Sequence, residues 1–301
     1  MDSRLKVNLA GIELKNPIIM ASGTYGYGEE FKNYYDPKIL GGIASKGITR
    51  YEKPGNTGIR IWETPSGILN SIGLENPGVE EFVKEKLEKM NTLGTKIFVN
   101  LGGNTVEEYV EAVEILNDYE FDAIELNISC PNVKEGGMAF GMEKDSAAAV
   151  VKKVMNVTNK KVFVKLSPNA GDIVGIAKAV EAEGATGISL INTILGMAID
   201  VDRESIVFDN VYAGMSGAAV KPIALRILHQ VAKEVKIPII GMGGITNYRD
   251  VLEFLMAGAT AVEIGTYNFM NPNAGEDIIK DLENYLEDKN KTVKDYIKKL
   301  V

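Results

Sequence analysis

The sequence is poor in cysteine and histidine, with one of each among its 301 residues. A single cysteine cannot form an internal disulfide, so we expect a reducing, cytoplasmic setting. One cysteine and one histidine also cannot build a structural zinc site or hold an iron–sulfur cluster on this chain. We therefore expect no bound metal.

Long apolar runs and clustered positive charges are missing as well. No run approaches the ~20 apolar residues that span a bilayer, and the opening stretch MDSRLKVNLAG lacks the apolar segment of a signal peptide. The formal net charge is −8, whereas binding to nucleic acid needs clustered lysine and arginine. We expect neither a membrane nor a nucleic acid as a partner.

Short apolar runs alternate with longer amphipathic runs along the whole sequence. The apolar runs are nearly continuous in apolar residues, as in parallel strands that are covered on both faces. We expect eight such strands, at 17–22, 41–47, 96–102, 123–129, 162–167, 187–193, 237–244 and 261–266.

The amphipathic runs predict helices between these strands. One run starts with an Asn76–Pro77 cap and another with a Thr105 cap. Strand–helix alternation repeated eight times predicts an α/β fold, a (β/α)₈ TIM barrel, with residues 1–301 forming a single domain. We also expect an N-terminal β-hairpin at 4–14 and insertions near 50–72 and 194–218.

The active site of such a barrel lies at the C-terminal ends of the strands. Amides, two lysines, one thiol and several glycines occur at these ends, but no histidine, aspartate or glutamate, which argues against most hydrolase mechanisms. The residues are Ser22, Lys46, Gly47, Asn100, Asn127, Ser129, Cys130, Lys165, Asn192, Thr193, Gly243, Gly244, Gly265 and Thr266.

Three groups among them indicate a ligand, although each also has a structural explanation. Glycines after the last two strands predict a phosphate site, because backbone N–H groups often bind phosphate there; plain tight turns are the alternative. The three asparagines predict a planar ligand such as a pyrimidine or a flavin; turn caps are the alternative. Lys165 could form a Schiff base, stabilise negative charge, or be an ion-paired core lysine.

Cys130 follows its strand directly and precedes Pro131, which favours an extended backbone. A lone cysteine is most often a small buried hydrophobic residue. Here no histidine or carboxylate accompanies it at the strand ends, so its thiolate is the obvious Brønsted base. His229, by contrast, lies within a predicted outer helix, where we expect a structural role.

Several motifs together resemble class 1 dihydroorotate dehydrogenase over almost the whole chain. They are NISCPN (127–132), ASKGIT (44–49), NSIGLENPG (70–78), VKLSPN (164–169), INT (191–193) and GMGGI (241–245). The resemblance implies an FMN-containing barrel that oxidises dihydroorotate to orotate in pyrimidine biosynthesis. It makes FMN the hydride acceptor and Cys130 the base.

The stretch VKEGGMAFG (133–141) resembles type B of this class. Type B implies a partner subunit, an iron–sulfur flavoprotein with FAD and a 2Fe–2S cluster that passes electrons to NAD, in a heterotetramer of two catalytic and two electron-transfer chains. The fumarate-using type A remains the alternative.

The resemblance also assigns roles to individual positions. It implies catalytic roles for Cys130 and Lys165. The implied FMN contacts are Ser22, Lys46, Gly47, Asn100, Asn127, Lys165, Ile191, Gly217, Gly243, Gly244, Gly265 and Thr266. The implied substrate contacts are Lys46, Asn70, Ser71, Ile72, Gly73, Leu74, Asn127, Asn192 and Thr193.

Three other functions stay open on the sequence. One is a Schiff-base (β/α)₈ aldolase that uses Lys165. Another is a tRNA dihydrouridine synthase, which should carry a basic RNA-binding extension that this acidic chain lacks. The third is a non-catalytic binding module, which would leave the cysteine, lysine and asparagine constellation unexplained.

Overall fold

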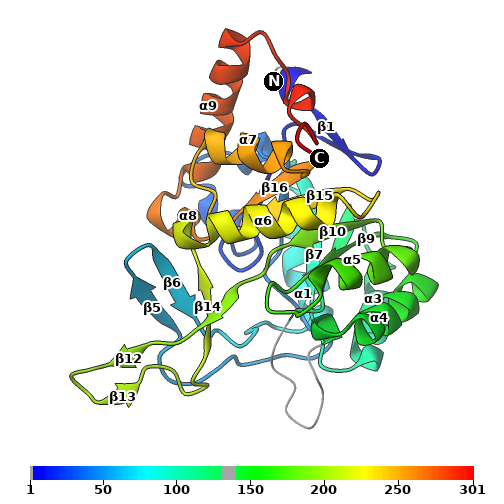
Figure 1. Cartoon of the computed structure of the whole chain (residues 1–301). Coiled ribbons are helices and arrows are strands. Elements are labelled where there is room, and N and C mark those ends of the chain that lie inside the picture. Colours follow the sequence, from blue (N-terminus) through cyan, green and yellow to red (C-terminus); the bar gives the residue numbers. More distant parts are fainter. Residues whose placement is uncertain (1–2, 130–139) are drawn as a thin grey trace.

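A closed barrel of eight parallel strands forms the centre of the protein (Figure 1). The computed structural model describes residues 3–129 and 140–301. Neighbouring strands around the barrel are β10 (Gly187–Leu190), β15 (Ile239–Met242), β16 (Ala261–Ile264), β3 (Ile18–Met20), β4 (Gly42–Ala44), β7 (Lys96–Leu101), β8 (Ala123–Asn127) and β9 (Lys161–Lys165). All eight predicted strands are confirmed.

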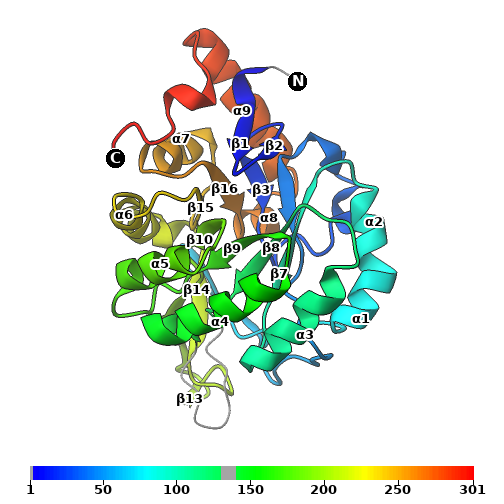
Figure 2. The same cartoon turned by 90° about the vertical axis from the view of Figure 1, so that its right-hand side faces the viewer.

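Helices surround the barrel, as the view in Figure 2 shows. They are α1 (Val79–Phe82), which continues through a π-helical turn (Val83–Leu87) into α2 (Glu88–Asn91), α3 (Val106–Leu116), α4 (Lys144–Val157), α5 (Ile173–Ala182), α6 (Lys221–Ala232), α7 (Tyr248–Met256), α8 (Tyr267–Met270) and α9 (Ala274–Asp288). Short 3-10 helices occur at Ser3–Leu5, Glu29–Phe31, Pro37–Ile39, Phe140–Met142, Ala218–Val220 and Val293–Asp295.

The two predicted helix starts have different outcomes. Thr105 caps α3 as predicted, because its side chain accepts a hydrogen bond from the backbone N–H of Glu108. The predicted Asn76–Pro77 cap is wrong: α1 begins at Val79, after Gly78. The side chain of Asn76 instead accepts hydrogen bonds from the backbone N–H groups of Thr49 and Gly78, which ties the loop after β4 to the start of α1.

The N-terminal hairpin is present as β1 (Val7–Leu9) and β2 (Ile12–Leu14). The two predicted insertions contribute β5 (Ile61–Thr64) and β6 (Gly67–Asn70) from the first, and β11 (Ile194–Gly196) and β14 (Ala213–Ser216) from the second. These strands form one antiparallel sheet in the order β11-β14-β6-β5. A small hairpin, β12 (Ile199–Asp200) with β13 (Ser205–Ile206), extends from it.

The shared sheet places residues 70–74 and 191–193 at the same end of the barrel. Asn70 pairs with Gly214 across β6 and β14, and its side-chain amide donates to the Gly214 carbonyl. In Figures 1 and 2 this sheet lies at the opposite end of the molecule from both termini and the β1–β2 hairpin. In the described part of the chain, no helix has the length and apolar character needed to cross a membrane.

Candidate active site

Lys165 ends β9 inside the barrel, where it is only 5% exposed. Its Nζ lies 3.2 Å from Oε2 of Glu125 and 3.5 Å from Oε2 of Glu263. Glu125 is on β8 and Glu263 on β16, two strands on opposite sides of the eight-stranded ring. The lysine therefore lies between a buried carboxyl group from the neighbouring strand β8 and a second one that reaches it across the barrel from β16.

These three groups shift one another's pKa values. Burial by itself lowers the pKa of Lys165, but the charges of Glu125 and Glu263 outweigh it and raise that pKa. Burial acts to raise the pKa of Glu125, yet the Lys165 charge and hydrogen bonds from neighbouring side chains lower it. Burial and the Glu125 charge raise the pKa of Glu263 well above the usual carboxyl value. Lys165 is thus a protonated ammonium at neutral pH.

The two glutamates were missed in the sequence because they lie within the strands and not at the strand ends. A signal was present: Glu125 and Glu263 are the charged residues inside otherwise apolar runs, AIELNIS and AVEIGT. A charged side chain at such a position must be paired or hydrogen-bonded in the folded protein. The interpretation of Lys165 as an ion-paired core lysine is confirmed.

Asn100 stands at the edge of this cluster. Its side-chain Nδ2 donates to Oε2 of Glu125 at 2.5 Å, while its Oδ1 is buried with no hydrogen-bond partner in the described part of the chain. A Cβ placed on Gly47 would lie 2.9 Å from that oxygen. The unpaired acceptor therefore faces the glycine after β4, at a position predicted from the sequence to contact a ligand.

The other two asparagines are brought together by a serine. The Oδ1 of Asn127 accepts from Oγ of Ser129 at 2.6 Å, and Nδ2 of Asn192 donates to the same hydroxyl. Asn192 also accepts from the backbone N–H of Thr193 at 2.7 Å. This chain of amides and hydroxyls joins the ends of β8 and β10. The sequence placed these residues at one end of the barrel, but it did not predict the hydrogen bonds between them. Cys130, the next residue after Ser129, lies outside the described residues.

The glycines after β15 adopt conformations that other residues rarely adopt. Gly243 has φ 127° and Gly244 has φ 75°. A Cβ on Gly244 would lie 2.8 Å from Cβ of Lys221 and 2.9 Å from the Gly217 carbonyl oxygen, so Gly244 packs directly against the start of α6. Gly265, after β16, differs, because a Cβ there would meet only Ala21 and Thr24 at 3.6 and 4.0 Å.

The buried carboxylate of Asp250, in the first turn of α7, holds this glycine loop in place. The Oδ2 of Asp250 accepts hydrogen bonds from the backbone N–H and the hydroxyl of Thr246, at 2.8 and 2.9 Å. Its Oδ1 lies 2.5 Å from Nζ of Lys221. On the far side of the loop, the hydroxyl of Thr266 bonds to that of Ser216 at 2.8 Å. The loops after β14, β15 and β16 are thereby held to one another.

Four further predicted positions lie at the C-terminal end of the barrel, which we call the mouth. Lys46 is half-buried and its backbone N–H donates to the Gly26 carbonyl. Leu74 reaches over Gly47, with its Cδ2 3.2 Å from where a Cβ would stand there. Ser22 is half-buried, and Ile191 is buried with its N–H donating to the Met242 carbonyl. Their contacts to a cofactor or substrate stay predictions.

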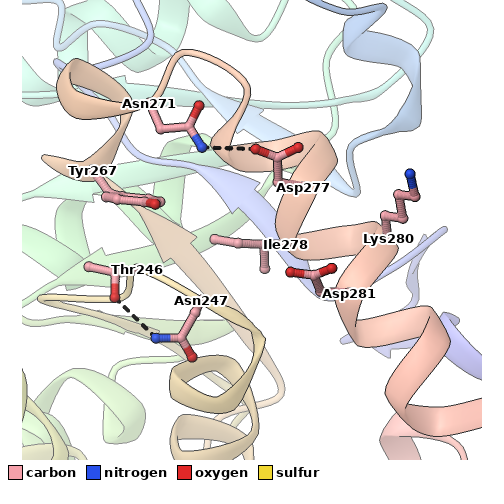
Figure 3. A pocket seen from close by; sticks show the side chains of 8 residues that line it. All are labelled: Thr246, Asn247, Tyr267, Asn271, Asp277, Ile278, Lys280 and Asp281. Carbon is pink, nitrogen blue, oxygen red and sulfur yellow. Dashed lines mark hydrogen bonds between the residues drawn. The ribbon is translucent and has the colours of Figure 1, made fainter. Parts of the chain in front are cut away.

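A separate hollow of about 330 Å³ lies between the loop after β15 and helices α8 and α9 (Figure 3). Its lining includes Thr246 and Asn247 on one side and Asp277 and Asp281 on α9 on the other. Asn271 donates to Asp277 at 2.9 Å. Two aspartates and one lysine, Lys280, line this hollow, so negative charge outnumbers positive charge there. It is therefore a poor site for an anion and does not replace the glycine loop as the candidate phosphate site.

Comparison with known proteins adds an independent finding. A family model described as "Dihydroorotate dehydrogenase" matches residues 4–286. A protein of Petrotoga mobilis named "dihydroorotate dehydrogenase B (NAD(+)), catalytic subunit" is 52% identical over 282 residues, 94% of each chain. Proteins of the same name from Brachyspira hyodysenteriae (52% over 298 residues, 98% of each chain) and Bacteroides thetaiotaomicron (51% over 284 residues, 94% of each chain) are equally similar.

Proposed function

This chain belongs to the dihydroorotate dehydrogenase family, and on that premise we propose that it is the catalytic subunit of an NAD-linked, type B dihydroorotate dehydrogenase. It oxidises dihydroorotate to orotate in pyrimidine biosynthesis. The observation that carries the proposal is the Lys165 ammonium. Two buried glutamates hold it next to the amide of Asn100, and Lys165 is paired in register with Asn127 on the neighbouring strand.

The residues present fit a bound FMN. The Oδ1 of Asn100 is a buried acceptor that lacks a partner within the described residues, and a ligand N–H would satisfy it. Gly265 leaves its Cβ position open, so a phosphate can approach the backbone there. The residues that would hold FMN are those implied by the family resemblance: Ser22, Lys46, Gly47, Asn100, Asn127, Lys165, Ile191, Gly217, Gly243, Gly244, Gly265 and Thr266.

When bound, FMN would supply a two-electron acceptor for the hydride that leaves dihydroorotate. Lys165 would place a positive charge where negative charge gathers on the reduced ring, an electrostatic role. Asn127 and Asn192, aligned by the Ser129 hydroxyl, would hold the amide and imide edges of the pyrimidine.

The remaining substrate contacts and the base are also proposed from the family. Lys46 and the 70–74 loop would bind the substrate carboxylate, and Thr193 would lie beside the pyrimidine. Cys130 would take the proton from C5 as a thiolate. The loop's position over Gly47 supports this arrangement, because it brings Leu74 to the same mouth as Asn100.

The geometry disfavours the aldolase alternative. A Schiff-base lysine must be neutral to attack a carbonyl, and such lysines have lowered pKa values. The pKa of Lys165 is raised by two adjacent carboxyl groups, so the amine is kept protonated. The fumarate-dependent type A alternative is disfavoured by the names of the relatives, which specify NAD(+).

A partner subunit follows from the designation "catalytic subunit" that the relatives carry. We propose that it is an iron–sulfur flavoprotein with FAD and a 2Fe–2S cluster, assembled with this chain as two catalytic and two electron-transfer subunits. One cysteine on this chain cannot ligate such a cluster. We also propose a cytoplasmic location, because one unpaired cysteine suits a reducing compartment.

The test is the colour and acceptor use of the purified full chain. We expect a yellow protein that dihydroorotate bleaches and that reduces NAD only slowly by itself. Rapid NAD turnover should appear when the partner purified from the source cell is added. A colourless chain that borohydride traps with an aldehyde or ketone substrate would refute the proposal. Efficient turnover with fumarate would assign the chain to type A.

A further inference from the structure

Glu125 and Glu263 differ in how many hydrogen bonds their carboxyl groups receive. Glu125 accepts from Oγ of Ser189 at 2.7 Å, from Nδ2 of Asn100 at 2.5 Å and from Lys165 at 3.2 Å. Glu263 accepts only from Lys165 at 3.5 Å within the described residues, and its Oε1 is buried without a partner there. Glu125 is thus built to carry a negative charge, whereas Glu263 is not.

The charges of this cluster do not balance if both carboxyl groups are ionised. One ammonium and two carboxylates would leave a net negative charge among side chains that are 0–5% exposed, which is strongly unfavourable. The two carboxyl groups also contact the same ammonium, because their Oε2 atoms lie 3.2 and 3.5 Å from Nζ of Lys165. Two ionised carboxylates held at one buried site repel each other, and a proton on one of them removes that repulsion.

We propose that Glu125 and Glu263 share one proton, which rests on Glu263, and that this proton keeps Lys165, Glu125 and Glu263 neutral as a group. The raised pKa of Glu263 and the lowered pKa of Glu125 agree with this distribution. The charged groups that face Glu263 in the described structure are Lys165 from β9 and Glu125 from β8. Ser189 and Asn100 add neutral donors to Glu125 alone.

The shared proton has a consequence for the flavin, and this step rests on the proposed function. If Glu263 were ionised, its charge would oppose that of Lys165 and disfavour the electron-rich reduced ring. When Glu263 is protonated, only the negative charge of Glu125 offsets the positive charge of Lys165. The two glutamates are therefore positioning residues, which act on the flavin through the lysine.

The direct test is infrared absorption of the purified full chain at pH 7. The C=O stretch of a protonated carboxyl group is separate from carboxylate absorption, and surface carboxylates are ionised at this pH. We expect a protonated-carboxyl band in the wild type and its loss in Glu263→Gln. The band should also disappear in Glu125→Gln, because Glu263 must then ionise to balance Lys165.

Asp250→Asn is the matched control. Asp250 is also buried, but it lies outside the barrel and its pKa is lowered, with hydrogen bonds from Lys221 and Thr246 that favour its ionised form. The band should survive in this variant. Absence of the band from the wild type, or its survival in Glu125→Gln, would overturn the proposal. If Glu125→Gln does not fold, the wild type decides: its band must persist above the usual carboxyl pH range and be absent from Glu263→Gln.

The second readout is the midpoint potential of bound FMN against pH. Where the band disappears at high pH, the wild-type preference for reduced over oxidised FMN should fall by at least tenfold, about 30 mV for a two-electron couple. Glu263→Gln should show no such fall in midpoint potential, and a fall of the same size in that variant would refute the link to the flavin. A chain that binds no FMN would refute the proposed function, while the infrared result would still decide whether the proton is shared.

Discussion

Replacing Lys165 by Met tests how strongly the barrel depends on its buried charge. Met keeps an unbranched apolar side chain of similar shape up to the Cε position but removes the ammonium that lies 3.2 Å from Glu125. Glu125 is 0% exposed and cannot regain water without opening the barrel. We therefore expect Glu125 to take up a proton when the variant folds.

The free-energy cost of protonating Glu125 in the folded variant follows from the linkage between pKa and stability. A carboxyl group with an ordinary pKa of 4.5 must be neutralised at pH 7, which spans ~2.5 pH units at about 1.4 kcal/mol each. The variant should thus lose about 3.5 kcal/mol of unfolding free energy at pH 7, within the range for broken buried ion pairs. At pH 5 the same cost falls below about 1 kcal/mol.

The sign of the pH dependence distinguishes this mechanism from a packing defect. In the variant, the folded-state pKa of Glu125 lies above its unfolded value. The stability that Glu125 contributes in the variant is therefore fully present below its unfolded pKa and is lost as the pH rises. Glu263 is protonated in both proteins, so it cancels in the comparison.

The measurement is urea unfolding of wild type and Lys165→Met at several pH values between 5 and 8. Lys221→Met is the control, since Lys221 pairs with Asp250 outside the barrel and Thr246 continues to donate two hydrogen bonds to that carboxylate. Its loss should be smaller and independent of pH. A Lys165→Met penalty that stays constant from pH 5 to 8 would refute the reasoning.

Three further predictions concern ligands. Gly265→Val should fold, because a Cβ there meets only ordinary contacts in the protein, and it should lose FMN, because the side chain would occupy the space open to the phosphate. Gly244→Val should instead lower the melting temperature, because its φ of 75° and the adjacent start of α6 exclude a side chain. FMN retention by Gly265→Val would place the phosphate elsewhere. Cys130→Ala should keep FMN and orotate binding but slow flavin bleaching by dihydroorotate roughly 10²–10⁴-fold in stopped flow; bleaching at the wild-type rate would make Cys130 a packing residue. Asn192→Ala should weaken orotate binding by about 1–3 kcal/mol without loss of FMN, since it leaves a pyrimidine edge unpaired; titration of the flavin spectrum with orotate measures it, and unchanged affinity would exclude the contact.

The sequence by itself determined the barrel and most of the residues at its mouth. Parallel strands buried on both faces must be apolar throughout, so the eight strands could be recognised as runs without any knowledge of their neighbours. The ends of such strands meet at one face of the barrel. For this reason, the side chains of Lys165, Asn100, Asn127 and Asn192 could be placed together before the structure was known.

The tertiary structure alone decided which side chains pair across the barrel. Glu125 and Glu263 are 138 positions apart in the numbering, and only closure of the eight-stranded ring brings both to Lys165. The same holds for the two insertions, whose strands β6 and β14 form one sheet over the mouth. Apolar runs and turn residues specify where a strand begins and ends. They carry no information about contacts between distant segments, because those contacts depend on how the whole chain closes on itself.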